Sequence, residues 1–399
     1  MTLTQQTIRK KAGEHQRYAS GFTYQKDGVY FAQIAEDLIQ EGVKELTELG
    51  ATQIIPSIRG IHFAADKATF YKVNYMSRLA SRILAPLVAF PCPDTDTLYR
   101  QAKQIRWETL FKKKSTFAIF SNVSDSSINH SQFASLRLKD SIVDYFRDLT
   151  GKRPDVDTQS PDIQINLHIR KDMADISIDA SGGALHKRGY REETITAPMQ
   201  ETVAAAIIRL SGWDGSLPLY DPMCGSGTLL CESLMQYCRI PAGSFRTTFG
   251  FEYLPDFNPD IWDQVKADAD AGTRNIQDGT IAGSDLDPRA VRAARINLMG
   301  LHNGNSVSVE QMDFRDLPSM PNMVLVANPP YGIRMGKEMD LKLFHKEFGD
   351  FLKQKCTGST AYVYFGDTTY MGCMGLKASW KKDLKAGGLE GKLARYELY

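Results

Sequence analysis

The chain has 399 residues, of which 42% are hydrophobic and 24% are charged, and its formal net charge is +1. This composition excludes a disordered or fibrous protein, and the length predicts two domains. The near-neutral charge means that any surface for nucleic acid has to be local, and no run of about 18 apolar residues could cross a membrane. The N-terminus lacks the apolar run of a signal peptide and the six cysteines form no disulfide framework, so we expect a cytoplasmic protein.

The first domain is expected over residues 29–180, after a polar and loosely attached N-terminal extension, residues 1–28. A helix is predicted from Ile34 to Leu49, with Gly50 ending it as a left-handed cap. Further strands and helices follow without a glycine-rich nucleotide loop, and the last two strands alternate apolar and polar residues as a hairpin would. The strands are predicted at 54–55, 60–63, 83–90, 115–122, 163–170 and 175–180, and the helices at 67–79 and 135–149. This order predicts a small α+β unit.

The boundary between the domains is predicted at a linker over residues 181–197, where a glycine pair precedes the basic segment 186–191. The second domain, residues 198–399, is expected to start with Pro198 in the first turn of a helix that reaches Leu210. Apolar strands then alternate with helices, which predicts a parallel, doubly wound sheet with its ligand crevice at the carboxyl ends of the strands. The strands are predicted at 217–220, 280–283, 306–309, 323–327 and 360–365, and the helices at 229–237, 289–298 and 341–352.

The first motif of this domain is the loop Asp221-Pro-Met-Cys-Gly-Ser-Gly-Thr228, which joins the first strand to its helix. Gly225 and Gly227 would let the backbone approach a ligand, and the N-terminus of the helix can receive a carboxylate. A plain tight turn is the alternative to a ligand site. The loop lacks the third glycine of a dinucleotide site and the lysine of a P-loop site. We nominate five residues of the loop as cofactor contacts: Asp221, Cys224, Gly225, Gly227 and Thr228.

Acidic residues follow the next two strands. Asp285 is expected to accept hydrogen bonds from both hydroxyls of a ribose. For Asp287, capping of the helix that begins at Pro288 is as plausible as ligand contact. Asp313 and Phe314 follow the third strand and could bind an adenine amine and pack on its face, although an aspartate in such a turn is more often solvated.

The fourth strand runs into Asn328-Pro329-Pro330-Tyr331. Two prolines fix the backbone and remove its donors, which leaves the side-chain carbonyl of Asn328 and the main-chain carbonyl of Pro329 as acceptors. Together they suit an exocyclic base amine with two protons, and Tyr331 offers a face on which a flipped-out base can stack. We nominate Asn328, Pro329 and Tyr331 as catalytic, with Asn328 also close to the cofactor.

These motifs resemble the THUMP-domain RNA guanine-N2 methyltransferases, and among them the N-terminal half of the bacterial large-subunit ribosomal RNA enzymes. The likeness is strongest in 185–191, in 197–199, in the loop 221–228 and in 328–334 with its Gly-Ile-Arg ending. It implies a Rossmann-like class I methyltransferase domain, with a mostly parallel seven-stranded sheet, after a ferredoxin-like and THUMP domain that binds RNA. It also implies that Pro198 and the nominated loop and strand-end residues surround S-adenosylmethionine. The sequence departs from the family pattern at 385–388, where an Asn-Gly turn is more usual.

Several basic residues are candidates for RNA contact. Lys187, Arg188 and Arg191 lie at the domain boundary, where a structural linker is the equal alternative, and Arg334 follows the fourth strand. The basic stretch 100–114 is read more readily as a solvated helix face than as a phosphate site. Three cysteines, at 224, 231 and 238, follow a helical spacing without the ligand pattern of zinc, so no metal is expected, and no histidine is nominated as a base.

The predicted activity is S-adenosylmethionine-dependent methylation of guanine N2 in 23S ribosomal RNA. Transfer RNA remains an alternative substrate. The same Asn-Pro-Pro-Tyr motif also serves DNA adenine-N6 and protein glutamine-N5 methyltransferases. An RNA-binding assembly factor without activity is the non-enzymatic alternative. RNA is the expected partner, no membrane partner is expected, and the sequence leaves open whether the chain is a monomer or a homodimer.

Overall fold

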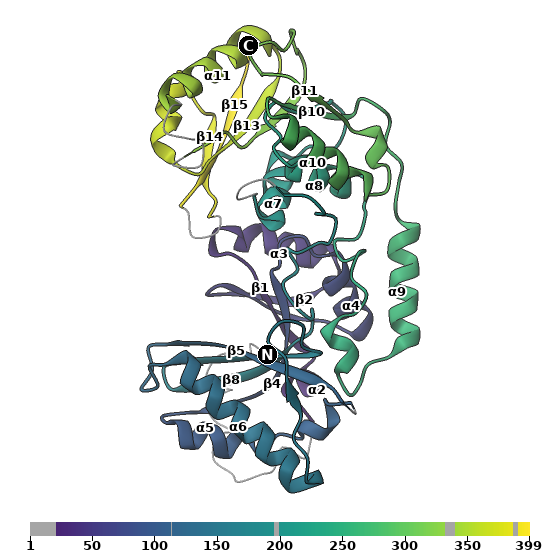
Figure 1. The fold of residues 1–399 in the computed structure, drawn as a ribbon, viewed down its shortest axis with the longest axis vertical. Helices are drawn as coiled ribbons and strands as arrows, with labels where there is room; N and C mark the ends of the chain where they lie inside the picture. The colour runs from purple at the N-terminus through teal and green to yellow at the C-terminus, as the bar shows by residue number, and fades with distance from the viewer. Residues whose placement is uncertain (1–20, 113, 195–198, 332–339, 386–389) are drawn as a thin grey trace.

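A computed structural model describes residues 21–112, 114–194, 199–331, 340–385 and 390–399. Two sheets organise the chain, and Figure 1 shows them in two units that follow one another along the longest axis of the molecule. The first unit contains the eight-stranded sheet and the second unit contains the seven-stranded sheet. Among the helices of the described ranges, none is both long and apolar enough to cross a membrane.

The first unit is built on a sheet with the strand order β2-β3-β1-β4-β8-β7-β5-β6. Its strands are antiparallel except for the pairs β5 with β7 and β5 with β6. The predicted hairpin is present, because β7 and β8 pair antiparallel from Ile165 opposite Ile178 to Arg170 opposite Met173. The elements are α2 (Thr23–Asp27), β1 (Val29–Gln33), η1 (Glu36–Leu38), α3 (Ile39–Glu48), β2 (Thr52–Ser57), β3 (Gly60–Ala64), α4 (Lys67–Met76), β4 (Arg82–Pro91), α5 (Thr95–Ala102), η2 (Trp107–Thr109), β5 (Thr116–Ser124), α6 (Ser131–Thr150), β6 (Asp155–Val156), β7 (Ile163–Arg170) and β8 (Met173–Asp179).

Two predictions for this unit are wrong. Residues 22–28 are not loosely attached, because Phe22 and Tyr24 are buried and α2 packs on β4 and β1. The predicted helix at 34–49 is shorter, since Glu36–Leu38 forms the 3-10 helix η1 and α3 spans only Ile39–Glu48. Ile34 is apolar because the chain stays in the core after the end of β1. A buried apolar residue at this position fits the same local sequence pattern as one on a helix face. Gly50 does take the predicted left-handed conformation, with φ of +100°.

The second unit has a seven-stranded sheet with the order β11-β10-β9-β12-β13-β15-β14. The pairs among β11, β10, β9, β12 and β13 are parallel, and β15 pairs antiparallel with β13 and β14. This is the predicted mostly parallel, doubly wound arrangement, so the carboxyl ends of the parallel strands share one edge. The elements are α7 (Glu201–Ser211), β9 (Leu219–Asp221), α8 (Thr228–Tyr237), η3 (Gly250–Tyr253), α9 (Pro259–Ala271), β10 (Ile281–Asp285), α10 (Pro288–Met299), η4 (Gly304–Ser306), β11 (Ser308–Gln311), β12 (Val324–Ala327), α11 (Leu341–Lys355), β13 (Thr360–Phe365), η6 (Thr368–Met374), β14 (Trp380–Asp383) and β15 (Lys392–Glu397).

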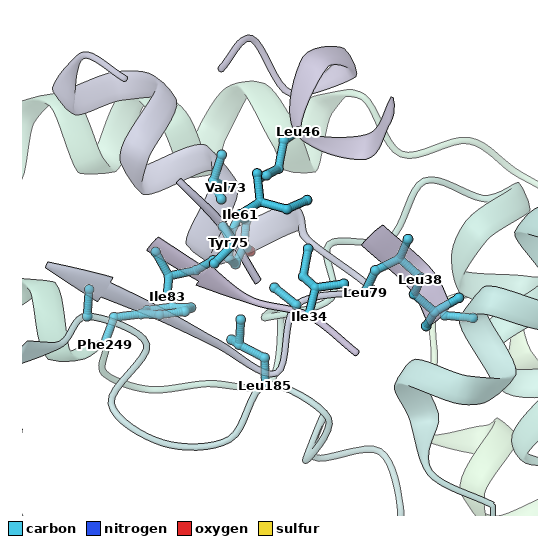
Figure 2. Close-up of a cluster of buried hydrophobic side chains, with 14 of the residues drawn as sticks. Ile34, Leu38, Leu46, Ile61, Val73, Tyr75, Leu79, Ile83, Leu185 and Phe249 are labelled. Atoms are coloured by element: carbon cyan, nitrogen blue, oxygen red, sulfur yellow. The ribbon is translucent and has the colours of Figure 1, made fainter. Parts of the chain in front are cut away.

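An aromatic contact joins the two units. The segment between α8 and β10, with η3 and α9, was not predicted, and in Figure 1 α9 runs down the side of the molecule to α4. Phe251 stacks on Tyr71 with ring centroids 4.6 Å apart, and Trp262 meets Tyr75 edge-on at 5.3 Å. Figure 2 shows the neighbouring core, where Phe249 of the second unit joins the same buried cluster as the first unit's side chains.

Candidate functional site

Three nominated residues lie at the shared edge of the parallel strands. Strand β9 lies between β10 and β12, with Asp221 opposite Gly283 and Leu219 opposite Val324. Asp221 ends β9, Asp285 ends β10, and Asn328 directly follows β12. Because these strands are parallel neighbours, the structure brings the three side chains to one edge of the sheet, as the sequence predicted.

The glycine loop is held in place by the strand beside it. Gly225 and Gly227 have φ of +56° and +80°, a left-handed conformation that favours glycine. The backbone N–H of Gly225 donates to Oδ2 of Asp285 at 2.8 Å, and that of Cys224 donates to the carbonyl of Ser284 at 2.9 Å. The loop after β9 is therefore tied to the end of β10.

Gly227 also has a packing role, and its contact with the cofactor stays a prediction. A Cβ at this position would lie 3.0 Å from Cβ of Ala294 in α10, so the missing side chain allows α8 and α10 to approach. The glycine also precedes Thr228, the first residue of α8. Gly227 therefore acts in helix packing, in addition to any contact that its backbone makes with a ligand.

Two carboxyl groups adjoin this loop, Asp221 buried and Asp285 half-buried. Asp221 is 1% exposed and Oδ1 accepts from the N–H of Met223 at 3.1 Å. Burial raises the pKa of Asp221, and the nearby charge of Asp285 raises it further. Burial also raises the pKa of Asp285, against the lowering effect of the backbone donors of Asp287 and Gly225. Hydrogen-bond donors of a bound ligand would stabilise the ionised form of either group.

Asp285 has capacity left for such donors. Its Oδ1 accepts from the N–H of Asp287 at 2.9 Å and its Oδ2 from that of Gly225. A carboxylate accepts about four hydrogen bonds, so each oxygen retains one acceptor position. Asp287 itself is the N-cap of α10 and accepts from the N–H of Arg289 at 2.9 Å, which favours the capping role for this residue.

The residues after β11 are occupied by protein contacts. Both oxygens of Asp313 contact Arg315, through its backbone N–H at 2.9 Å and its guanidinium at 2.7 Å. Phe314 is 4% exposed, and its ring packs edge-on against Phe344 and Phe348 of α11, at 5.3 Å each. The contact of this pair with adenine stays a prediction, and the Phe314 ring is first of all part of the core.

Asn328 carries an unsatisfied acceptor. Its Oδ1 is buried and has no hydrogen-bond partner among the described residues. A buried carbonyl without a partner costs about 1 to 3 kcal/mol, and such groups in folded proteins need an explanation. The ring of Tyr331 packs at the end of the adjacent strand β13, since a Cβ at Gly366 would lie 2.4 Å from that ring. Tyr331 also meets Tyr364 edge-on at 6.4 Å.

A residue that the sequence did not single out, Asn297, connects the linker to the glycine loop. It lies on α10 and is fully buried. Its Oδ1 accepts from the N–H groups of Glu192 and Glu193, and its Nδ2 donates to the carbonyls of Glu193 and Ser226, all at 2.9 to 3.1 Å. All four bonds of the amide are thus made. The one signal in the sequence for this role of Asn297 was a polar residue on the apolar face of a predicted helix.

Two of the three basic residues nominated in the linker are paired with acids inside the protein. Arg188 is 1% exposed and lies 3.4 Å from Glu232, with further bonds to the carbonyls of Leu185 and Arg78. The predicted RNA contact of Arg188 is therefore wrong, because its charge is buried and paired. Arg191 binds Glu201 at 2.9 Å and reaches Oγ of Ser226 at 3.3 Å, so it supports the glycine loop.

The remaining candidates have varied outcomes. Lys187 is exposed, and its RNA contact stays a prediction. Pro198 and Arg334 lie outside the described residues. In the basic stretch 100–114, Lys103 pairs with Asp148 and Arg106 with Glu108, which favours a solvated charged face. The described part of the chain holds no group of three or more histidine, cysteine or acidic residues suited to a metal.

Comparison with known proteins gives matches along most of the chain. Three family models match: "RlmL ferredoxin-like domain" at residues 42–84, "THUMP domain" at 92–179 and "RMKL-like, methyltransferase domain" at 188–395. A protein of Synechocystis with the name "Putative RNA methyltransferase slr0064" is 39% identical over 371 residues, 93% of this chain and 97% of the relative.

A second relative and a solved structure are also similar to this chain. The "Ribosomal RNA large subunit methyltransferase K/L" of Vibrio parahaemolyticus is 35% identical over 89% of this chain, and the match covers 51% of the relative. The chain therefore spans about half the length of the K/L relatives. The crystal structure of SMU.472, solved in complex with SAH, has a TM-score of 0.82 and 28% identity, and covers 93% of this chain and 98% of that one.

Proposed function

Because this chain belongs to the RMKL-like methyltransferase family, we propose that it methylates the N2 amine of guanine in large-subunit ribosomal RNA. Membership of the family makes it an S-adenosylmethionine-dependent RNA methyltransferase, with a ferredoxin-like and a THUMP domain before the methyltransferase domain. The base, the atom and the RNA are the finer part of the proposal. We also propose a first domain that includes α2 and ends at residue 180, a linker at 181–197, and a second domain at 198–399.

The residues at the strand edge fit the cofactor. Asp285 would accept the ribose hydroxyls with the acceptor positions that its backbone bonds leave free. The loop 221–228 would contact the methionine part, where Gly225 and Gly227 bend the backbone before the N-terminus of α8. The contacts of Asp221, Cys224, Thr228, Asp313 and Phe314, and of Pro198, remain part of the same proposal. When bound, S-adenosylmethionine supplies a methyl carbon that a nucleophile can attack opposite the sulfur.

One observation carries the assignment of the reaction: the unsatisfied Oδ1 of Asn328 at the end of β12. An amine hydrogen would satisfy this oxygen, and the carbonyl of Pro329 would accept the second hydrogen. A base amine is a poor nucleophile because its lone pair is delocalised into the ring. Accepting both hydrogens favours the tetrahedral geometry that frees the lone pair, so catalysis comes from positioning and from these acceptors. Tyr331 would stack on the base.

Product analysis tests the proposal. Protein and labelled S-adenosylmethionine would be incubated separately with large-subunit ribosomal RNA from cells lacking the gene, with transfer RNA, with duplex DNA and with protein. Mass spectrometry of the digested ribosomal RNA should then detect N2-methylguanosine. Methylated adenine, or methyl transfer to DNA or protein alone, would contradict the base and substrate.

A further inference from the structure

The two faces of the eight-stranded sheet differ in what covers them. On one face Tyr30 of β1 stacks on Phe70 of α4 at 3.9 Å, and Ser121 of β5 donates to the carbonyl of Ser131 in α6. Neighbouring residues in a strand point to opposite faces, so Phe31 and Phe120 lie on the other face. Phe120 is 40% exposed, which shows that this second face is open to solvent.

The registers place a set of rings and hydrogen-bonding groups on this second face, which we call the open face. Phe31 pairs with His62, Phe120 with Asn166, Asn122 with His168, and His168 with Asp175. Each of these residues alternates with core residues of its own strand. The open face comprises Phe31, His62, Phe120, Asn122, Asn166, His168 and Asp175.

Basic groups lie near His168 on this face. Burial lowers the pKa of its imidazole, and the charges of Arg170 and of Arg59, in the turn between β2 and β3, lower it further.

Aromatic and imidazole rings are spread over the open face. The rings of Phe31 and His62 lie 4.8 Å apart, and the guanidinium of Arg82 lies 5.2 Å from the centre of the Phe120 ring. Burial lowers the pKa of His62 as well as that of His168, so both imidazoles are neutral near pH 7 and can stack or hydrogen-bond without a charge. The amides of Asn122 and Asn166 add donors and acceptors between the rings.

We propose that the open face binds a single-stranded segment of the RNA substrate, with its bases stacked on Phe120 and on the Phe31–His62 pair. This rests on the proposed function only in that the ligand is RNA. Stacking on aromatic rings requires unpaired bases, because the faces of paired bases are covered by their neighbours in a helix.

Basic side chains lie near the rings of this face. Arg59 and Arg170 are close enough to His168 for their charges to lower its pKa, and Arg170 is 3.7 Å from the exposed Asp125. Asp179 is 2% exposed and paired with Arg82, and Asp125 and Asp175 are exposed. Arg59 and Arg170 would contact the phosphates of an RNA strand whose bases stack on the rings.

Binding assays on the full chain test this. Fluorescence anisotropy at one fixed salt concentration would compare a labelled single-stranded RNA of about twelve nucleotides with a duplex of the same sequence. The single strand should bind more tightly, and Phe120→Ala and His62→Ala should each weaken its binding on the order of tenfold. Phe120→Trp, which keeps a stacking face, should restore it.

Matched controls come from the opposite side of the sheet. Phe133 and Leu136 on α6 are 55% and 46% exposed, and their replacement by alanine should leave RNA binding unchanged. Calorimetric binding of S-adenosylmethionine by each variant verifies the fold. Wild-type RNA affinity in both open-face variants, or tighter binding of the duplex, overturns the proposal whichever base is methylated.

Photocrosslinking does not depend on the stability of a variant. Wild-type protein irradiated with RNA that contains 4-thiouridine should give adducts at open-face residues of β1, β3, β5, β7 or β8, and adducts confined to the rest of the chain would contradict the proposal. Conversely, if the open face is confirmed but the product is not N2-methylguanosine, the proposed function fails and this binding surface remains.

Discussion

The carboxyl edge of the seven-stranded sheet and the domain junction around Arg188 both carry residues that the sequence nominated, with opposite outcomes. At the edge, Asp285 and Asn328 follow the two parallel strands that flank β9, so the topology brings both to the same edge of the sheet. At the junction, Arg188 points inward to Glu232, 44 residues away, and to the carbonyl of Arg78, 110 residues away. Motifs within a short stretch of sequence therefore predict well where residues lie in the fold. Whether a charged side chain is buried or exposed depends instead on partners that are distant in the sequence.

The junction gives the largest expected effect. Arg188→Ala should lower the free energy of unfolding by about 3 to 5 kcal/mol, because it leaves the carboxylate of Glu232 buried without its cation. Thermal or denaturant unfolding measures this loss. The adjacent, exposed Lys187→Ala is the control and should unfold like the wild type. Normal stability of Arg188→Ala together with weaker RNA binding would return Arg188 to the substrate site.

Replacement of Asn328 tests the proposed site at the carboxyl edge of the seven-stranded sheet. Asn328→Ala should reduce the rate of methyl transfer on the order of a hundredfold, while the affinity for S-adenosylmethionine is kept. The physical reason is the loss of the acceptor that holds the base amine. Single-turnover kinetics with saturating RNA, and calorimetry with the cofactor, measure the two quantities. Wild-type turnover would refute the role of the side-chain carbonyl.

Asp285 separates cofactor binding from turnover. Asp285→Ala should weaken the binding of S-adenosylmethionine on the order of tenfold or more, because two charge-assisted hydrogen bonds to the ribose are lost. Asp287→Ala is the matched control: it removes the cap of α10 and about 1 kcal/mol of stability, but should leave the cofactor affinity intact. Equal affinities of Asp285→Ala and the wild type would argue against the ribose contact.

Asn297 should give the smallest effect on the reaction. Asn297→Ala removes the four bonds between the linker and the glycine loop, so we expect a KM for S-adenosylmethionine about threefold to tenfold higher, with kcat nearly unchanged. A purely structural role would lower stability without this split. Arg292→Ala is the control, since Arg292 lies on the same helix and reaches Glu193 from the solvent side.

The parallel strands of the second unit were predictable from the sequence, because apolar runs alternate with helices and each nominated motif follows a strand. The glycine loop and the Asn328 motif carry their own conformational constraints in glycine and proline. By contrast, β1, β14 and β15 were not predicted, and the helix after β1 was started too early because Ile34 and Leu38 fit a helical period with the residues of α3. Asn297 was missed because an asparagine in a helix gives no local sign of the backbone groups that it binds.

The docking of α9 against α4 has a consequence for how the chain folds. Separating the halves at the linker would leave Tyr71 and Tyr75 without Phe251 and Trp262, and would expose their rings to water. The boundary at residues 181–197 thus divides two architectures but not two independently folding bodies. We expect one cooperative melting transition for the intact chain, and aggregation-prone fragments if it is cut there.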